Sequence, residues 1–151
     1  MSSSPRESAA ALKARALRLL ARREHSRDEL ARKLSPHAES PQILQDLLHD
    51  LESKKQLSNE RFAEVRAHWL ARKYGAARIV QDLRRKGVAQ DLVDHAVSGM
   101  NELEKARAIL ARKYRQPAAT REERARRARF LQSRGFSYDT IYQAVRISDD
   151  E

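Results

Sequence analysis

Apolar residues recur along this chain at every third or fourth position, which is the spacing of the buried face of a helix. The pattern is clearest at Leu12, Ala16, Leu19 and Leu20; at Ile43, Leu44, Leu47 and Leu51; at Phe62, Val65 and Trp69; and at Leu103, Ala106, Leu110 and Tyr114. Hairpin dipeptides are absent and β-branched clusters are few, so no strands are expected. We interpret these positions as core, with base stacking by Trp69 as the alternative interpretation.

Residues typical of helix ends divide the pattern into nine predicted helices. Ser26, Asn101 and Thr120 each precede a glutamate by three residues, as in a capping box, and Pro41 follows Ser40. Glycines that follow basic helical stretches are predicted to be C-terminal caps: Gly75, Gly87 and Gly135. The predicted helices span 7–24, 26–34, 41–55, 59–74, 76–86, 90–99, 102–115, 121–134 and 138–147.

A five-residue block occurs three times, as LARRE from Leu20, LARKY from Leu70 and LARKY from Leu110. A period of 40 to 50 residues is typical of stacked supersecondary units. The sequence therefore predicts an all-α chain of three tandem three-helix repeats that form an elongated, curved, solenoid-like molecule of right or left hand. The predicted repeats are 7–55, 57–99 and 101–147, and residues 1–6 and 148–151 are predicted to be flexible tails.

Charge alternates in step with the repeat. The chain has 31 lysines and arginines against 21 acidic residues, with a net charge of +10. The net charge is +5 over 1–34, −3 over 35–60, +6 over 61–90, −4 over 91–104, +9 over 105–134 and −3 over 135–151. Because equivalent helices align in a stack, we expect the basic helices to form one extended surface suited to a polyanion. In the alternative interpretation, these charges only supply weak salt bridges between neighbouring repeats.

Several kinds of chemistry have no signature here. The chain lacks cysteine, and no metal-ligand spacing occurs among His25, His37, His49, His68 and His95, which are predicted to be surface or partly packed. Glycine-rich phosphate loops and long apolar runs are also absent. We therefore expect a cytoplasmic protein that is not an enzyme, with no cofactor, no metal and no membrane contact.

Four stretches, in this order and spacing, resemble the RecX family, which are bacterial regulatory proteins of the RecA recombinase. They are 20–34, 57–63, 73–88 with Ile79 and Leu83, and 130–137 followed by Ile141; Asn59 stands where the family usually has aspartate. The resemblance implies three tandem three-helix repeats without a catalytic centre. It also implies binding along the groove or at the end of the RecA–DNA filament, which limits strand exchange, ATP hydrolysis and SOS coprotease activity.

The basic residues predicted to contact acidic RecA patches and DNA phosphate lie in the second and third repeats. They are Arg72, Lys73, Arg84, Arg85 and Lys86, and Arg112, Lys113, Arg124, Arg127 and Arg134. The expected partners of this monomer are the RecA filament and single- and double-stranded DNA, bound without sequence preference.

Two other functions remain open. One is a helix-turn-helix DNA-binding regulator that acts independently of RecA, although the middle helices lack a base-reading cluster and no dimerisation element is visible. The other is a protein-interaction solenoid without nucleic-acid contact.

Overall fold

The computed structural model describes residues 6–146, and this part of the chain is helical and contains no strand. The helices are α1 (Ala9–Arg22), α2 (Arg27–Leu34), α3 (Pro41–Ser53), α4 (Asn59–Leu70), α5 (Ala76–Arg85), α6 (Gln90–Val97), α7 (Glu102–Lys113), α8 (Arg121–Ser133) and α9 (Tyr138–Arg146). A 3₁₀ turn, η1 (Ser35–His37), follows α2 and was not predicted. Of the predicted tails, Arg6 is described and donates a hydrogen bond to the Glu39 carbonyl (3.3 Å), and the rest lies outside the described residues.

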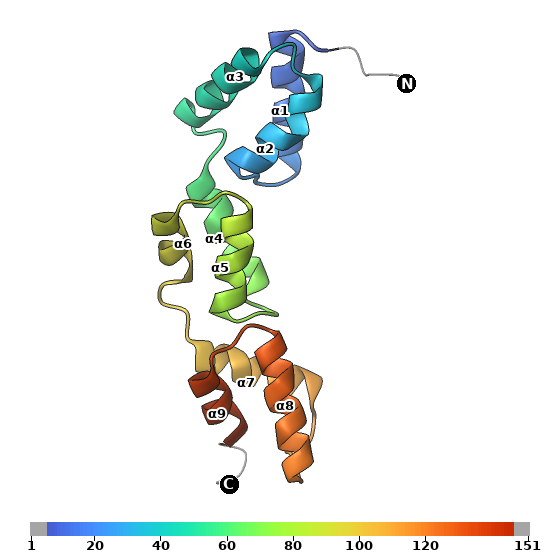
Figure 1. Cartoon of the computed structure of the whole chain (residues 1–151), viewed down its shortest axis with the longest axis vertical. Coiled ribbons are helices and arrows are strands. Elements are labelled where there is room, and N and C mark those ends of the chain that lie inside the picture. Colours follow the sequence, from blue (N-terminus) through green and yellow to red (C-terminus); the bar gives the residue numbers. More distant parts are fainter. Residues whose placement is uncertain (1–5, 147–151) are drawn as a thin grey trace.

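The helices form three groups of three that follow one another along the long axis of an elongated molecule (Figure 1). In this view the third helix of each group, α3, α6 or α9, lies on the left, and α2, α5 and α8 lie to its right. Equivalent helices of successive groups therefore occupy equivalent sides of the stack, as expected for tandem repeats.

Each group has its own apolar core. The buried side chains include Leu12, Leu30, Leu34, Leu48 and Leu51 in the first group, Phe62, Ile79, Leu83 and Val93 in the second, and Ile109, Leu110, Leu131, Phe136 and Ile141 in the third. Burying a side chain of this size contributes about 1.5–3 kcal/mol relative to leaving it exposed. The first cluster also takes in Leu57, from the segment that leads into α4. Since the clusters otherwise stay within one group, the junctions between groups depend mainly on other contacts.

Local sequence signals set most of the helix ends. The Ser26 hydroxyl accepts the Glu29 amide (3.1 Å) while the Glu29 carboxylate accepts the Ser26 amide (3.3 Å), which confirms that capping box. Gly87 and Gly135 follow α5 and α8 with φ of 80° and 87°, as C-terminal caps require. The prediction for Gly75 was wrong, because this residue precedes α5 as its N-cap with φ of −77°.

The assignment of Val65 and Trp69 to the core was also wrong, since they are 58% and 55% exposed. Helix α4 buries a neighbouring face made of Phe62, Ala63, Ala67 and Leu70. Two of these four side chains are alanines. The prediction followed the larger Val65 and Trp69 and therefore assigned the wrong face of the helix to the core.

His25 is buried, at 1% exposure, contrary to the expectation of a surface or partly packed position. Its Nδ1 lies 3.0 Å from the Arg23 carbonyl oxygen and its Nε2 lies 3.0 Å from Lys33 Nζ. A neutral ring with the proton on Nδ1 satisfies both contacts, because it donates to the carbonyl and accepts from the ammonium. Burial lowers the pKa of His25, against the opposing effect of the Arg23 carbonyl, and the nearby charges of Arg23 and Lys33 lower it further.

Stability is therefore expected to fall with acidification as the unfolded state protonates His25 first. The unfolded imidazole has a pKa of about 6.5, so the loss begins near that pH and continues down to the lower folded pKa. One proton gives a slope of at most about 1.4 kcal/mol per pH unit. Urea unfolding from about pH 7.5 to 5 measures this loss, and His25→Phe should reduce it. The control is His49→Gln at an exposed site. An equal loss in wild type and His25→Phe would contradict the prediction.

No helix in the described part of the chain combines the length and apolar character needed to cross a membrane.

Candidate functional site

Charged side chains join the first group of helices to the second. Glu29, which caps α2, accepts two hydrogen bonds from Arg23 (3.0 and 2.9 Å) and lies 3.6 Å from Lys86 of the second group. Burial opposes ionisation of this carboxyl, but the hydrogen bonds and charge of Arg23, the Ser26 amide and the charge of Lys86 hold the pKa of Glu29 at about 2. Arg61 pairs with Glu24 at 2.9 Å across the same junction. These ion pairs remain formed at neutral pH.

The residue that departs from the usual family pattern, Asn59, also acts at this junction. Its Oδ1 accepts a hydrogen bond from the Arg27 backbone amide (2.8 Å). Arg27 is the first residue of α2, so its amide has no partner inside that helix. The first residue of α4 thus satisfies the start of a helix in the preceding group.

Hydrogen bonds that each involve at least one backbone group make the second junction. The Gly75 amide donates to the Arg134 carbonyl (2.7 Å), and Arg78 Nη1 donates to the Ser133 carbonyl (3.0 Å). The Ala76 amide donates to the Glu102 carboxylate at 3.0 Å. A Cβ on Gly75 would lie 2.4 Å from the Gly135 oxygen, so the two backbones meet where a side chain cannot fit. This contact places the turn after α8 against the start of α5.

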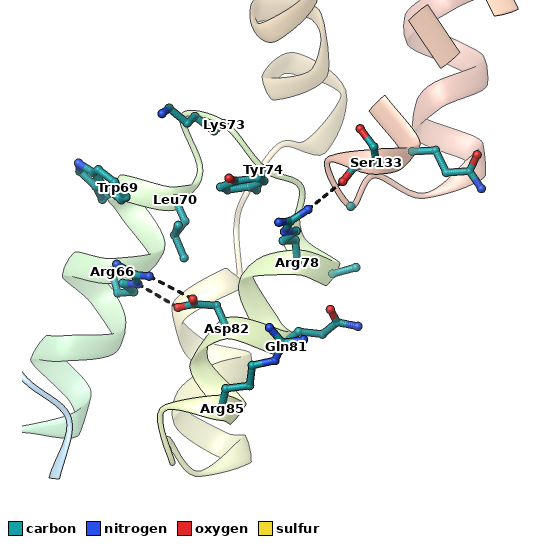
Figure 2. A pocket seen from close by; sticks show the side chains of 13 residues that line it. Arg66, Trp69, Leu70, Lys73, Tyr74, Arg78, Gln81, Asp82, Arg85 and Ser133 are labelled. Atoms are coloured by element: carbon teal, nitrogen blue, oxygen red, sulfur yellow. Dashed lines mark hydrogen bonds and ion pairs between the residues drawn. The ribbon is translucent and has the colours of Figure 1, made fainter. Parts of the chain in front are cut away.

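A cleft of about 640 Å³ opens at this second junction, and we call it the junction cleft. Its walls come from α4, α5 and the turn after α8 (Figure 2). The side chains that give it its chemical character are Arg66, Trp69, Lys73, Tyr74, Arg78, Asp82 and Arg85. Four cations against one carboxylate make its lining positive, and Trp69 adds an exposed aromatic ring.

Four of the ten predicted contact residues are exposed on the second group. Lys73 and Arg85 line the junction cleft, and Arg72 and Lys73 line an adjoining hollow of about 220 Å³ with Arg112. The fourth, Arg84, donates a hydrogen bond to Gln90 Oε1 (2.8 Å). The structure therefore brings together Arg72, Lys73, Arg85 and Arg112, which come from three segments of the chain.

Most of the other predicted contact residues also stabilise the fold. Lys86 pairs with Glu29, and Arg112 donates a hydrogen bond to the Arg72 carbonyl across the second junction. Arg127 donates to the Gln116 carbonyl (2.7 Å) and lies over Tyr114, Lys113 lies 3.8 Å from the Phe130 ring centroid, and Arg134 lies over Tyr74 and Phe130. Arg124 is half-buried on α8. The role of each as a contact for RecA or DNA stays a prediction.

Sequence reasoning missed Arg66 and Arg78 as cleft residues. Arg66 binds Asp82 through two hydrogen bonds (2.9 and 3.1 Å), which raise the pKa of its guanidinium. Arg78 sits three residues after Gly75 and reaches the third group through Ser133. Both positions lie in one cleft with Lys73 because α4 packs against α5, and the second junction adds the turn after α8 as a further wall. A local sequence pattern reveals neither contact.

These features define a class of protein: an elongated stack of three-helix repeats with a cationic cleft at its second junction. Three family models, described as the first, second and third three-helix domains of RecX, match residues 13–51, 58–97 and 101–145. The chain belongs to the RecX family.

Relatives named Regulatory protein RecX are similar over most of their length. The protein of Leptothrix cholodnii is 46% identical, with 93% of this chain and 90% of the relative covered, and that of Ralstonia nicotianae is 42% identical, with 91% and 88% covered. The crystal structure of RecX from Lactobacillus salivarius matches with a TM-score of 0.79 at 20% identity, over 93% of this chain and 96% of that chain. These comparisons bear out both the predicted family and the all-α, three-repeat fold.

Proposed function

We propose that this chain is a non-catalytic modulator that inhibits the RecA recombinase. In this proposal it binds as a monomer, in the bacterial cytoplasm, along the groove or at the end of the RecA–DNA filament. Bound there, it limits strand exchange, ATP hydrolysis and SOS coprotease activity. Family membership and the relatives' name, Regulatory protein RecX, support the regulatory role.

The placement of exposed cations on an elongated stack carries the proposal. Lys73 and Arg85 are exposed, line the positive cleft at the second junction and pair with no described carboxylate. Elsewhere carboxylates neutralise cations, as Glu29 does for Lys86 at the first junction and Glu102 does for Lys105 on α7. This arrangement attracts an elongated partner with repeated negative charge, such as DNA phosphates flanked by an acidic protein surface.

In this proposal, inhibition follows from the presence of the bound molecule on the filament. A molecule that spans neighbouring RecA protomers would exclude partner DNA from the groove, and one bound at an end would alter filament growth. Neither effect requires a bond to be made or broken on this chain. Cations that contact both RecA and phosphate would favour the assembled filament over its separate parts.

Titration of the single-strand-dependent ATPase of RecA at two salt concentrations tests the proposal. We expect inhibition at less than one molecule per RecA protomer, with a weaker effect at the higher salt. A fully active filament at every ratio would exclude RecA as the target. Sequence-selective footprints on duplex DNA without RecA would then favour the helix-turn-helix regulator. Salt-insensitive binding to RecA without DNA would favour the protein-interaction solenoid.

The double variant Arg84→Glu/Arg85→Glu is expected to raise the concentration for half-inhibition of the RecA ATPase about tenfold. Both side chains are exposed in the last turn of α5, so charge reversal removes attraction without opening the core. Helical circular dichroism should be preserved, although losing cations at a helix end costs about 0.3–1 kcal/mol each.

Arg22→Glu/Arg32→Glu is the matched control for this pair. Arg22 and Arg32 are exposed and lie in the last turns of α1 and α2, so this variant has the same change in net charge and a similar helix-end cost. We expect the control to inhibit nearly as well as wild type. Equal inhibition by all three proteins would remove Arg84 and Arg85 from the contact surface.

A further inference from the structure

Trp69 is an exposed aromatic ring at the edge of the junction cleft. It is the single tryptophan of the chain, it is 55% exposed, and it lines three neighbouring hollows of about 640, 340 and 220 Å³. The Arg66 guanidinium carbon lies 5.8 Å from the ring centroid, at the range of a cation–π contact. The ring is therefore partly fixed by its neighbour while more than half of its surface remains open to a ligand.

The charge beside this ring is positive and only partly compensated. Arg66 and Asp82 neutralise each other through their two hydrogen bonds. Arg78 is held at the Ser133 carbonyl, which leaves its charge in place (Figure 2). Lys73 and Arg85 are exposed and form no ion pair with another described residue. A ligand of this cleft should therefore carry negative charge near Lys73 and Arg85.

An aromatic ring beside unpaired cations fits single-stranded nucleic acid better than duplex. A single strand offers base faces that stack on aromatic side chains, while its phosphates contact lysine and arginine. In a duplex the base faces are covered by neighbouring bases, so an exposed tryptophan would gain no stack. The second aromatic of the cleft, Tyr74, already lies beneath Arg78 (4.6 Å to the ring centroid) and Arg134 (5.4 Å), which leaves Trp69 as the stacking platform.

We propose that the junction cleft is a single-strand nucleic-acid subsite in which one base stacks on Trp69 and phosphates of the same strand contact Lys73 and Arg85. The inference deepens the proposed function and rests on it, because it assigns the nucleic-acid contact of a filament modulator to one place. It also sets the stoichiometry of stacking at one base per molecule.

Intrinsic fluorescence tests the subsite directly, because Trp69 alone supplies the tryptophan emission. The full-length protein is titrated with a thymidine 20-mer at low salt. We expect saturable quenching that follows binding measured by anisotropy of the labelled 20-mer. Inorganic polyphosphate, which has phosphates but no bases, should bind without this quenching, and a duplex of the same length should leave the emission nearly unchanged.

Substitutions distinguish the contribution of base stacking from that of the phosphate contacts. Trp69→Ala is expected to weaken binding of the 20-mer about tenfold, and Trp69→Phe to restore most of the affinity. Lys73→Ala/Arg85→Ala should weaken binding and reduce the log–log salt slope by about 1.4, from two single-strand phosphate contacts. Tyr142→Ala, at another exposed aromatic, and Arg22→Ala/Arg32→Ala are the matched controls and should bind like wild type.

The RecA ATPase assay distinguishes failure of the subsite from failure of the proposed function. Unchanged Trp69 emission with saturating 20-mer, or wild-type affinity in Trp69→Ala, overturns the subsite even if wild type still inhibits RecA. Quenching and loss of affinity in a protein that does not inhibit RecA would support the subsite and contradict the proposed function. Loss of RecA inhibition in Trp69→Ala with unaltered binding of the 20-mer would mean that the cleft docks protein, and would also overturn the subsite.

Discussion

Replacing Gly75 with valine is expected to lower the free energy of unfolding by about 2–4 kcal/mol. The Cβ would lie 2.4 Å from the Gly135 oxygen and 2.9 Å from the Phe136 nitrogen, which are backbone atoms that cannot rotate away. The two groups of helices must separate there, which strains the packing and breaks the 2.7 Å hydrogen bond from the Gly75 amide to Arg134. Overpacking of this kind costs about 1–3 kcal/mol, and a lost hydrogen bond adds about 1 kcal/mol.

Urea unfolding of Gly75→Val and wild type measures this cost. Ala125→Val introduces the same side chain on an exposed face of α8 and should change stability by less than about 1 kcal/mol. The backbone of Gly75 has φ of −77°, which any residue adopts, so a large effect would come from contact rather than from backbone strain. Equal midpoints for Gly75→Val and wild type would show that the second junction is not closely packed.

Raising the salt concentration from about 50 to about 200 mM is expected to weaken binding to duplex DNA about a thousandfold. About six phosphate contacts give a log–log slope near −5, because each releases condensed counterions from the duplex. The exposed cations of the second and third groups are numerous enough to supply these contacts, even though Lys86, Arg112 and Arg134 also hold the junctions. Anisotropy of a labelled duplex at several salt concentrations measures the slope.

Single strands give a useful comparison, since each phosphate contact contributes only about 0.7 to their slope against about 0.9 for duplex. The same set of contacts should therefore yield a shallower line with a single strand. Binding that does not change with salt would exclude phosphate contact. It would leave any inhibition of RecA to protein–protein contacts.

Much of the fold could be predicted because its signals are local. Ser26, Ser40, Ser58, Asn101 and Thr120 each accept the backbone amide three residues on, so a side chain and a helix start are linked within one turn. Gly87 and Gly135 were predictable for the same reason, because a left-handed residue ends the helix that precedes it. Repetition of the LAR block then indicated how many such units the chain contains.

The errors involve contacts between distant segments. Gly75 looked like a cap because it follows a basic helix, but it is required where two backbones from different groups meet. Val65 and Trp69 looked buried because large side chains dominate a periodic pattern, whereas Ala63 and Ala67 lie on the packed face. In neither case does the neighbouring sequence carry the deciding information.

The positive charge of the candidate site could be predicted from the sequence, but the shape of the cleft could not. Lys73 and Arg85 were among the predicted contact residues because they belong to basic helix ends, which a count of charges reveals. The cleft that contains them also needs Arg66 and Arg78, which the packing of α4 against α5 places there, and the turn at Ser133, which the second junction adds. A charge pattern thus locates a surface, while the tertiary contacts determine where on that surface a ligand fits.

The separation of the three apolar cores has a mechanical consequence. Deforming a helical group would expose fully buried leucines, whereas bending the first junction mainly disturbs ion pairs and hydrogen bonds that water can partly replace. The molecule is therefore stiff within each group and more compliant between the first and second groups. Such a chain of rigid segments can adjust its curvature to a helical binding partner whose pitch varies, and no group needs to unfold partially.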